Sequence, residues 1–205
     1  MRTGGRAPQD EPHGEPRGKP KGWNEASFSA TLSAARAGDS AALAKIHREC
    51  SPAVAGYLRS QGVADVGGTT NDVFLRVFTR LVTFAGDEVC FRSWMFTIAH
   101  HLMIDELRRK ARRPKITDGA SVETKEQRGD AEEEALAGLG RERVDRMLAR
   151  LSIDQRAVVL LRVVEDLPID QVAEILGKRP TAVKALQHRA LAALRRHLVD
   201  EEVSP

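Results

Sequence analysis

The stretch FRSWMFTIAHHLMIDELRRKARRPK, residues 91–115, begins apolar and aromatic and ends as a run of cations. Apolar side chains recur in its first half at helical spacing, which predicts an amphipathic helix: Trp94, Met95, Ile98, Ala99, Leu102 and Met103. Six cations follow within about two turns: Arg108, Arg109, Lys110, Arg112, Arg113 and Lys115. A helix whose first half packs in a core and whose end is basic is suited to binding a phosphate backbone. A surface helix with a solvated basic end would show the same pattern. The rest of the chain is needed to distinguish this alternative from a nucleic-acid-binding helix.

The composition is typical of a soluble globular protein with unevenly placed charge. The 205 residues are enough for one medium domain or two small ones. Apolar residues make up 41% of the chain and charged residues 30%, and no apolar run is long enough to cross a bilayer, so no membrane insertion is expected. The polar N-terminus, rich in proline and glycine, is unlike a secretory signal. The formal net charge is only +3, so the placement of the charge matters more than its total.

The two cysteines, Cys50 and Cys90, bear on metal binding and on the redox compartment. Cys50 continues an apolar stripe with Leu43 and Ile46, which is typical of a small core residue. His47 and Cys50 could form half of a metal site, with Cys90 and a later histidine as the other half. No close cysteine pair supports such a site, and we expect neither a metal nor a cofactor. No disulfide framework is indicated, which fits a reducing cytoplasm. The aromatic content of 4% and the abundant Ala, Leu, Arg and Glu predict an all-α chain.

Turn and cap residues divide the chain before residue 71. A first helix is predicted over residues 24–37, with Gly38 placed to end it and Asp39 placed to cap the next helix. Pro52 is expected near the end of that second helix or at the start of a third segment. Residues 62–69 are predicted to form a loop because they contain a Gly-Gly pair.

The segment NDVFLRVFTRLV, residues 71–82, is predicted to form an amphipathic helix with two distinct faces. One face carries the apolar side chains Phe74, Val77, Phe78 and Leu81. The other face carries Asp72, Leu75, Arg76 and Thr79. A single exposed leucine usually has no special role, but Leu75 beside Asp72 and Arg76 could anchor a contact with another protein.

Two segments lack the apolar side chains that a core requires. Residues 1–22 are rich in proline and glycine and are expected to form a disordered N-terminal arm. Residues 114–140 hold seven acidic residues against three basic ones and are expected to form an acidic flexible linker. We therefore expect two small helical domains, residues 23–113 and 141–200, followed by a tail at residues 201–205.

The second domain is predicted to start with residues 141–151, where Val144, Met147, Leu148 and Leu151 recur at helical spacing, and a capped helix is predicted to follow. Residues 152–155 read Ser-Ile-Asp-Gln, a capping-box sequence in which the serine and the glutamine satisfy each other's backbone N–H groups. The helix that follows, over residues 154–164, is expected to point Val158, Leu161 and Val164 inward.

A helix-turn-helix is predicted next, with a short helix at residues 168–176 and a longer one at residues 181–198. Ala173 would let the two helices approach, Gly177 would take the left-handed turn, and Val183 would lock the second helix into the core. Any helical hairpin with a glycine turn is the alternative. The outward face of the second helix has cations and polar donors and no acidic residue, which suits a major groove: Thr181, Lys184, Ala185, His188, Arg189, Arg195 and Arg196.

The combination resembles the extracytoplasmic-function (ECF) sigma factors, bacterial sigma-70 relatives that keep only regions 2 and 4. Four segments carry the resemblance: ARAGDSAALAKIHRECSPAV (residues 35–54), TNDVFLRVF (70–78), FRSWMFTIAHHLMIDELRRKARR (91–113) and the helix-turn-helix segment 151–198. The resemblance implies a protein that binds core RNA polymerase, directs it to promoters and helps to melt the −10 region. It implies no catalytic activity, and a cytoplasmic, nucleoid-associated location in a bacterium.

The resemblance also implies which residues make the contacts. The clamp helices of the largest polymerase subunit would meet Asn71, Asp72, Leu75, Arg76 and Thr79. The −10 element would meet His100, His101, Asp105, Arg108, Arg109, Lys110, Arg112 and Arg113. Independently of the resemblance, Asp105 is expected to bond to neighbouring arginines because they lie close to it in the sequence. The −35 element would meet Arg179, Thr181, Lys184, Ala185, His188, Arg189, Arg195 and Arg196. Region 4 would also meet the polymerase flap, and an anti-sigma factor is a possible further partner.

Several positions depart from the family pattern. The family's Arg-Asn after Ile-Ala is His100-His101 here, which bears on −10 preference, since that Asn commonly helps to capture a flipped base. Leu186 stands where the family often directs an arginine toward DNA. The promoter sequences therefore cannot be carried over from the family.

Two other functions fit parts of the sequence. A one-component transcription regulator would combine a sensor at residues 24–113 with a helix-turn-helix output, but the basic end of the 91–115 stretch argues against a sensor. A nucleic-acid-processing enzyme would need a P-loop, a metal set or clustered carboxylates, and the sequence contains neither GxxxxGK[ST] nor HExxH.

Overall fold

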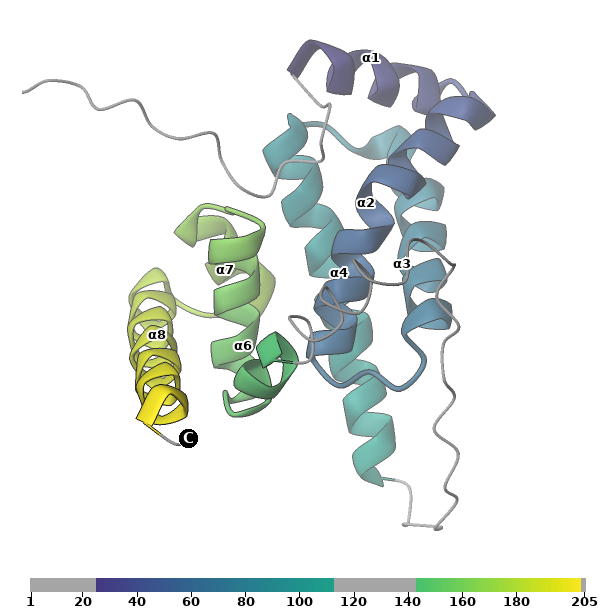
Figure 1. The fold of residues 1–205 in the computed structure, drawn as a ribbon. Helices are drawn as coiled ribbons and strands as arrows, with labels where there is room; N and C mark the ends of the chain where they lie inside the picture. The colour runs from purple at the N-terminus through teal and green to yellow at the C-terminus, as the bar shows by residue number, and fades with distance from the viewer. Residues whose placement is uncertain (1–24, 113–142, 204–205) are drawn as a thin grey trace, which may run out of the picture.

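The structure, a computed structural model, describes residues 25–112 and 143–203, and this part of the chain is helical throughout apart from its turns (Figure 1). The first unit consists of α1 (Glu25–Arg36), α2 (Ser40–Ser60), α3 (Val66–Arg80), the short 3₁₀ helix η1 (Leu81–Thr83) and α4 (Glu88–Arg112). The second consists of a helix at residues 143–149, α6 (Ile153–Val159), the π-helical segment η2 (Leu160–Val164), α7 (Ile169–Leu176) and α8 (Pro180–Val203). The all-α prediction is confirmed. The predicted arm at 1–22, the predicted linker at 114–140 and the last two residues of the predicted tail lie outside the described residues.

Aromatic side chains hold the first unit together, because they fill the space between α1, α2 and α4. Phe28 of α1 packs against Phe91 of α4 with ring centroids 5.5 Å apart. Tyr57 of α2 meets Phe96 of α4 edge to face at 5.6 Å. All four rings are buried. In Figure 1, α2, α3 and α4 run side by side and α1 crosses one end of them.

Helix α2 corrects the prediction for Pro52. The helix runs without interruption from Ser40 to Ser60 and includes Pro52. The proline removes one backbone hydrogen bond, which costs about 3 kcal/mol in a helix interior. Burial of Val54, Tyr57 and Leu58 on the same side of the helix offsets that cost at roughly 1.5–3 kcal/mol for each large apolar side chain. The predicted cap of the same helix is confirmed, since the Asp39 carboxylate accepts from the N–H groups of Ala41 and Ala42.

The start of α3 corrects the predicted loop at residues 62–69. The helix begins at Val66, so Gly67 and Gly68 lie in its first turn. Asp65 caps the helix, and its Oδ1 accepts from the Gly68 N–H at 2.8 Å. A β-carbon at Gly68 would lie 2.2 Å from Asp65 Oδ2, so this cap requires a glycine there. The Gly-Gly pair therefore serves to start a helix, where the sequence had suggested a loop.

The second unit confirms the capping box and the helix-turn-helix. Ser152 and Gln155 form both reciprocal hydrogen bonds at the start of α6. Gly177 ends α7 in the left-handed conformation, with φ at +61°, and Val183 of α8 is fully buried.

Val164 corrects the inward face predicted for the helix at residues 154–164. The helix widens into η2, where the Glu165 N–H bonds to the Leu160 carbonyl. This extra residue in the turn rotates Val164 away from the core, and its side chain is exposed.

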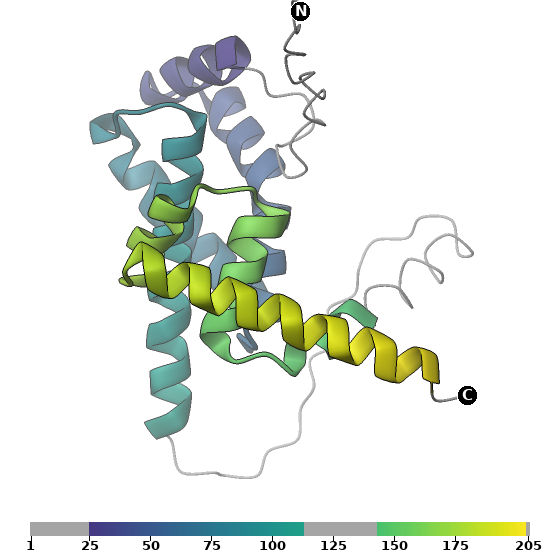
Figure 2. The ribbon, with the colours of Figure 1, turned by 90° about the vertical axis from the view of Figure 1, so that its left-hand side faces the viewer.

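The two units pack against each other through α7, which lies between α4 and α8 (Figures 1 and 2). Arg92 of α4 and Glu165, which follows η2, form an ion pair with Nη2 and Oε2 2.8 Å apart. Both residues are almost completely buried, with 4% and 7% of their surface exposed. The Arg92 guanidinium also donates to the Glu165 carbonyl, and the Arg156 guanidinium donates to the Ser60 carbonyl. No helix in the described ranges is both long and apolar enough to span a membrane.

We expect Phe96→Ala to lower the free energy of unfolding of the first unit by about 3–5 kcal/mol, because it leaves a cavity beside Tyr57. Urea denaturation followed by circular dichroism measures the change. Leu198→Ala, which truncates an exposed side chain on α8, is the control and should stay within about 0.5 kcal/mol of the unmodified chain. A similar loss in both variants would contradict the assignment of Phe96 to the core.

Candidate functional site

The outer face of α3 is an exposed stripe that includes an unpartnered leucine. Leu75 is 66% exposed, whereas Val73, Phe74 and Val77 turn inward. The predicted contact residues are all exposed on this helix: Asn71, Asp72, Leu75, Arg76 and Thr79. Thr79 Oγ1 donates to the Leu75 carbonyl at 2.7 Å, so its methyl group and Leu75 contribute the apolar part of the stripe.

Val82 extends this stripe and was missed in the sequence. It is 73% exposed and lies seven residues after Leu75, in η1. A spacing of seven returns to the same side of a helix, so the periodicity contained the signal. The sequence prediction assigned Val82 to neither face of the helix.

The second half of α4 presents the predicted cations to solvent. His101, Asp105, Arg108, Arg109, Lys110 and Arg112 are exposed, and Arg113 lies outside the described residues. The prediction that Asp105 bonds to neighbouring arginines is wrong, because within residues 25–112 and 143–203 it forms no ion pair with an arginine. The neighbouring Glu106 has the structural role: its carboxylate accepts from the Ala64 N–H and from Thr69 Oγ1, both at 3.0 Å.

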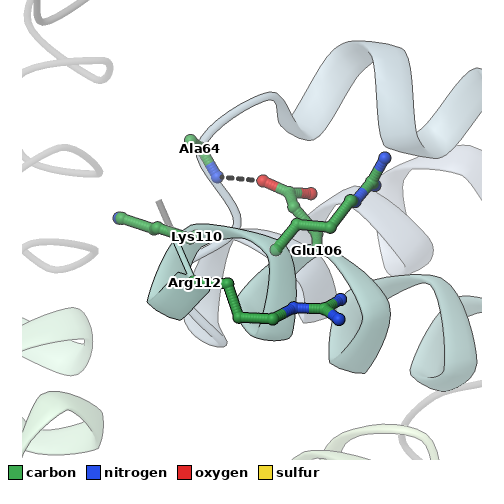
Figure 3. A pocket seen from close by; sticks show the side chains of 5 residues that line it. Ala64, Glu106, Lys110 and Arg112 are labelled. Atoms are coloured by element: carbon green, nitrogen blue, oxygen red, sulfur yellow. Dashed lines mark hydrogen bonds between the residues drawn. The ribbon is translucent and has the colours of Figure 1, made fainter. Parts of the chain in front are cut away.

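A hollow of about 520 Å³ lies at this basic end of α4. Figure 3 shows Ala64 and Glu106 bonded to each other, with Lys110 and Arg112 beside them, and Arg109 completes the lining. Because Glu106 is engaged by the loop before α3, the three cations dominate the surface around the hollow. A hollow of this kind can hold a phosphate oxygen by charge-assisted hydrogen bonds.

Helix α8 lies on the side of α7 away from α4 (Figure 1) and carries a second set of exposed cations. Val183 and Ala190 are buried against the rest of the second unit, while Leu186 is half-buried. The predicted contact residues are all exposed: Arg179, Thr181, Lys184, Ala185, His188, Arg189, Arg195 and Arg196. The small Ala185 lies between Lys184 and Arg189 and leaves room for close approach to a groove. Five of the eight residues are cations, so this face can bind a polyanion such as the phosphate backbone of DNA along the length of the helix.

Comparison with protein families identifies both units. Residues 47–113 match the family described as "Sigma-70 region 2", and residues 141–194 match "Sigma-70, region 4". The chain belongs to the ECF sigma factors of the sigma-70 family. We refer to the first unit as region 2 and to the second as region 4.

Curated ECF RNA polymerase sigma factors resemble the chain over most of its length. It is 30% identical to SigD of Mycobacterium tuberculosis over 181 residues, which cover 83% of each chain. It is 31% identical to SigX of Bacillus subtilis, over 64% of this chain and 73% of SigX. It is 30% identical to BldN of Streptomyces coelicolor over 82% of this chain, but this match spans only 64% of the length of BldN. A solved structure of CnrH in complex with the cytosolic domain of CnrY has the same fold, with a TM-score of 0.60 and 24% identity over 85% of this chain and 98% of that chain.

His100 is buried, unlike the other residues predicted for the −10 element. Only 7% of its surface is exposed, and its Nδ1 lies 2.8 Å from the hydroxyl oxygen of the buried Tyr57. Burial, together with the neighbouring His101 and the Lys178 ammonium of region 4, lowers the pKa of His100 to about 4, against the opposing effect of Asp154. Burial also raises the pKa of Tyr57, so both partners stay neutral. Of the adjacent histidines His100 and His101, only His101 is exposed.

Neither cysteine lies in a metal site. Cys50 is buried, as predicted, and burial raises its pKa to about 12, whereas Cys90 is exposed. In the described parts of regions 2 and 4, no group of three or more His, Cys, Asp or Glu side chains is placed to hold a metal ion.

We expect the free energy of unfolding to fall as the pH decreases from about 6.5 toward 4, because the unfolded chain protonates His100 and the folded chain does not. The contribution of His100 is complete above its ordinary pKa of 6.5 and can reach about 3 kcal/mol. Urea denaturation at a series of pH values measures the slope.

The matched variants separate His100 from other groups that titrate. His100→Gln keeps a hydrogen-bonding side chain beside Tyr57 but cannot titrate, so its stability should depend less on pH in this range. His101→Gln, which changes the exposed histidine, should keep the slope of the unmodified chain. Equal slopes in all three proteins would rule out His100 as the buried titrating group.

Proposed function

We propose that this chain is a promoter-directing subunit that binds core RNA polymerase and helps to open the −10 region. The observation that carries the proposal is the exposure of three separate faces in one chain of this family: the leucine stripe on α3, the basic end of α4 and the cationic face of α8. Each face has the chemistry of a different contact, and a chain with all three can link a polymerase to two DNA elements.

The α3 face would bind the clamp helices of the largest polymerase subunit. An exposed leucine flanked by an aspartate and an arginine can bury its apolar side chain in a partner while the charges fix the orientation. Leu75 would be the anchor, Asp72 and Arg76 would flank it, and Val82 would extend the contact. Region 4 would make a second contact with the polymerase flap.

The two basic faces would divide promoter recognition between them. Helix α8 would lie in the major groove at −35, where Lys184 and Arg189 can contact bases or phosphates. At −10 the cations of α4 would hold the backbone while unstacked bases are captured, which offsets a melting cost of a few kcal/mol per base. This task requires no catalytic group in the chain, and phosphodiester synthesis would belong to the polymerase. The chain would act in the bacterial cytoplasm at the nucleoid.

Transcription in vitro tests the proposal directly. Bacterial core polymerase is given a pool of promoter fragments from the source organism, with and without this chain. Specific run-off transcripts should appear only when the chain is added, and their start sites map both promoter elements. Duplex binding by the chain alone, without polymerase association or new transcripts, would instead support a one-component regulator.

We expect Leu75→Ala to weaken binding to core polymerase about tenfold, because truncating a buried anchor at an interface costs roughly 1–2 kcal/mol. A titration of labelled chain with core polymerase measures the dissociation constant. Leu198→Ala, which removes an exposed leucine from α8, is the control and should bind normally. Unchanged affinity in Leu75→Ala would rule out α3 as the main contact.

We expect Lys184→Ala and Arg189→Ala to weaken holoenzyme binding to promoters through the −35 element. If a residue contacts phosphate, its loss should reduce the salt dependence of log K by about one unit, and if it contacts a base, its loss should relax the sequence preference at one position. Arg48→Ala is the matched control, since it removes an exposed cation from α2, far from α8 in sequence. Full −35 selectivity in both α8 variants would contradict this role.

A further inference from the structure

The side chain of Glu106 connects the end of α4 to the start of α3. Its Oε1 accepts from the Ala64 N–H and its Oε2 accepts from Thr69 Oγ1, both at 3.0 Å. Figure 3 shows the Glu106 carboxylate bonded to the loop that contains Ala64. Ala64 precedes α3 and Thr69 lies in the first turn of that helix, so one carboxylate bonds on both sides of the helix start.

The two segments that Glu106 joins lead directly into two of the proposed contact faces. Thr69 is followed three residues later by Asp72, which belongs to the α3 face proposed for polymerase. Glu106 is followed two residues later by Arg108, the first of the exposed cations at the end of α4. The hydrogen bonds of Glu106 therefore link the helix that carries the polymerase face to the helix that carries the −10 cations.

The Glu106 carboxylate does not pair with the cations of its own helix. A glutamate on a helix commonly pairs with a cation three or four residues later, and Arg109 and Lys110 occupy those positions. Within residues 25–112 and 143–203, Glu106 forms an ion pair with neither of them. Both cations line the same hollow as Glu106, yet its carboxylate bonds to the start of α3. This side chain therefore connects two helices and does not simply balance the charge of the basic end.

Glu106 is also the last polar link between α4 and the rest of region 2. In the part of the chain that the structure describes, no side chain after Glu106 in α4 forms a hydrogen bond or an ion pair with another helix or loop. Leu107 is partly buried, and the five residues that follow it in α4 are exposed. The middle of α3, in contrast, is held in the core by Val73, Phe74 and Val77. Loss of Glu106 would therefore release the basic end of α4 and leave α3 in the core.

We propose that Glu106 is a positioning residue for promoter opening, which fixes the basic end of α4 relative to the polymerase-binding face of α3. The proposal rests on the function proposed above. Capture of the strand offsets the cost of melting only if the cations meet that strand where the bound polymerase holds it. Groups that bind are kept in a productive geometry by hydrogen bonds from the residues that support them. Glu106 supplies this support without touching DNA or polymerase.

Two substitutions at Glu106 remove the same charge but differ in hydrogen bonding. Glu106→Ala loses both bonds, whereas the amide of Glu106→Gln can still accept from the Ala64 N–H and can donate to the Thr69 hydroxyl oxygen. The assay uses holoenzyme on a promoter mapped by transcription, with 2-aminopurine in the −10 element, whose fluorescence rises when the base unstacks. Glu106→Ala should open this promoter about tenfold more slowly than the unmodified chain, and Glu106→Gln should stay within about twofold of it.

Equal rates of opening in the two variants would overturn the proposal. If both open the promoter faster, the lost negative charge is what matters, because the neighbouring cations then hold the strand more strongly. If both are slowed to the same extent, or neither is changed, the hydrogen bonds of Glu106 do not position the basic end.

Thr69→Val tests the same link from α3. This variant removes the hydroxyl that donates to Glu106 and should slow opening about threefold, and adding it to Glu106→Ala should slow opening no further, because both changes remove one shared bond. Thr97→Val is the matched control and should open the promoter at the unmodified rate, since the Thr97 hydroxyl bonds to the Ser93 carbonyl within α4. Additive effects of Thr69→Val and Glu106→Ala would contradict a shared role.

Two further measurements separate positioning from a loss of folding and from the function on which the proposal rests. Glu106→Ala should bind core polymerase within about twofold of the unmodified chain, and a loss of affinity as large as the loss of opening would overturn the proposal. In the free chain, amide hydrogen exchange at residues 107–112 should be about tenfold faster in Glu106→Ala and unchanged in Glu106→Gln. Unchanged exchange in Glu106→Ala would also overturn it. If the unmodified chain gives no specific transcripts, the proposed function fails, whereas the exchange comparison still tests the link between the helices.

Discussion

The buried pair between Arg92 and Glu165 is the interaction on which the observed arrangement of this protein depends. It joins residues 73 positions apart and links α4, the central helix of region 2, to the segment that leads into the helix-turn-helix. A buried charge without its partner is strongly unfavourable, so each residue specifies the position of the other. Because α7 then packs on α4, the two helical units share one continuous core although they match two separate family regions.

Helix α4 combines a buried first half with an exposed basic end. Its first half is buried on nearly all sides, by the other helices of region 2 and by region 4, whereas its basic end projects into solvent. The buried His100 lies near the transition, bonded to Tyr57 and influenced by charges of region 4. The cations that follow are exposed in this arrangement, so the burial of α4 stops short of its basic end.

Local sequence patterns predicted the features that depend on neighbouring residues alone, such as helix caps, turns and the exposed face of a helix. The capping box at Ser152, the Gly177 turn and the exposed Leu75 follow from spacing and backbone preference, and the structure has all three. Pro52, the Gly67-Gly68 pair and Val164 were predicted wrongly because tertiary burial, a cap and a widened helical turn outweighed local propensity. The packing of region 4 on region 2 could not be predicted at all. In the sequence, Arg92 within a helix and Glu165 before a turn both look like ordinary surface residues. The assignment of contacts to DNA and polymerase remains a prediction, based on the resemblance and on the exposure of the side chains.

The chemistry of the buried pair suits a contact that specifies geometry more than stability. Burial raises the pKa of Glu165 even though the Arg92 guanidinium lowers it, so the cost of desolvating the carboxylate exceeds the attraction that it gains. A pair with this balance specifies geometry while adding little net stability, because both side chains regain water when the regions separate. The apolar core that the two units share contributes free energy from every buried side chain, so the packing gains its stability from this core and its geometry from the ion pair.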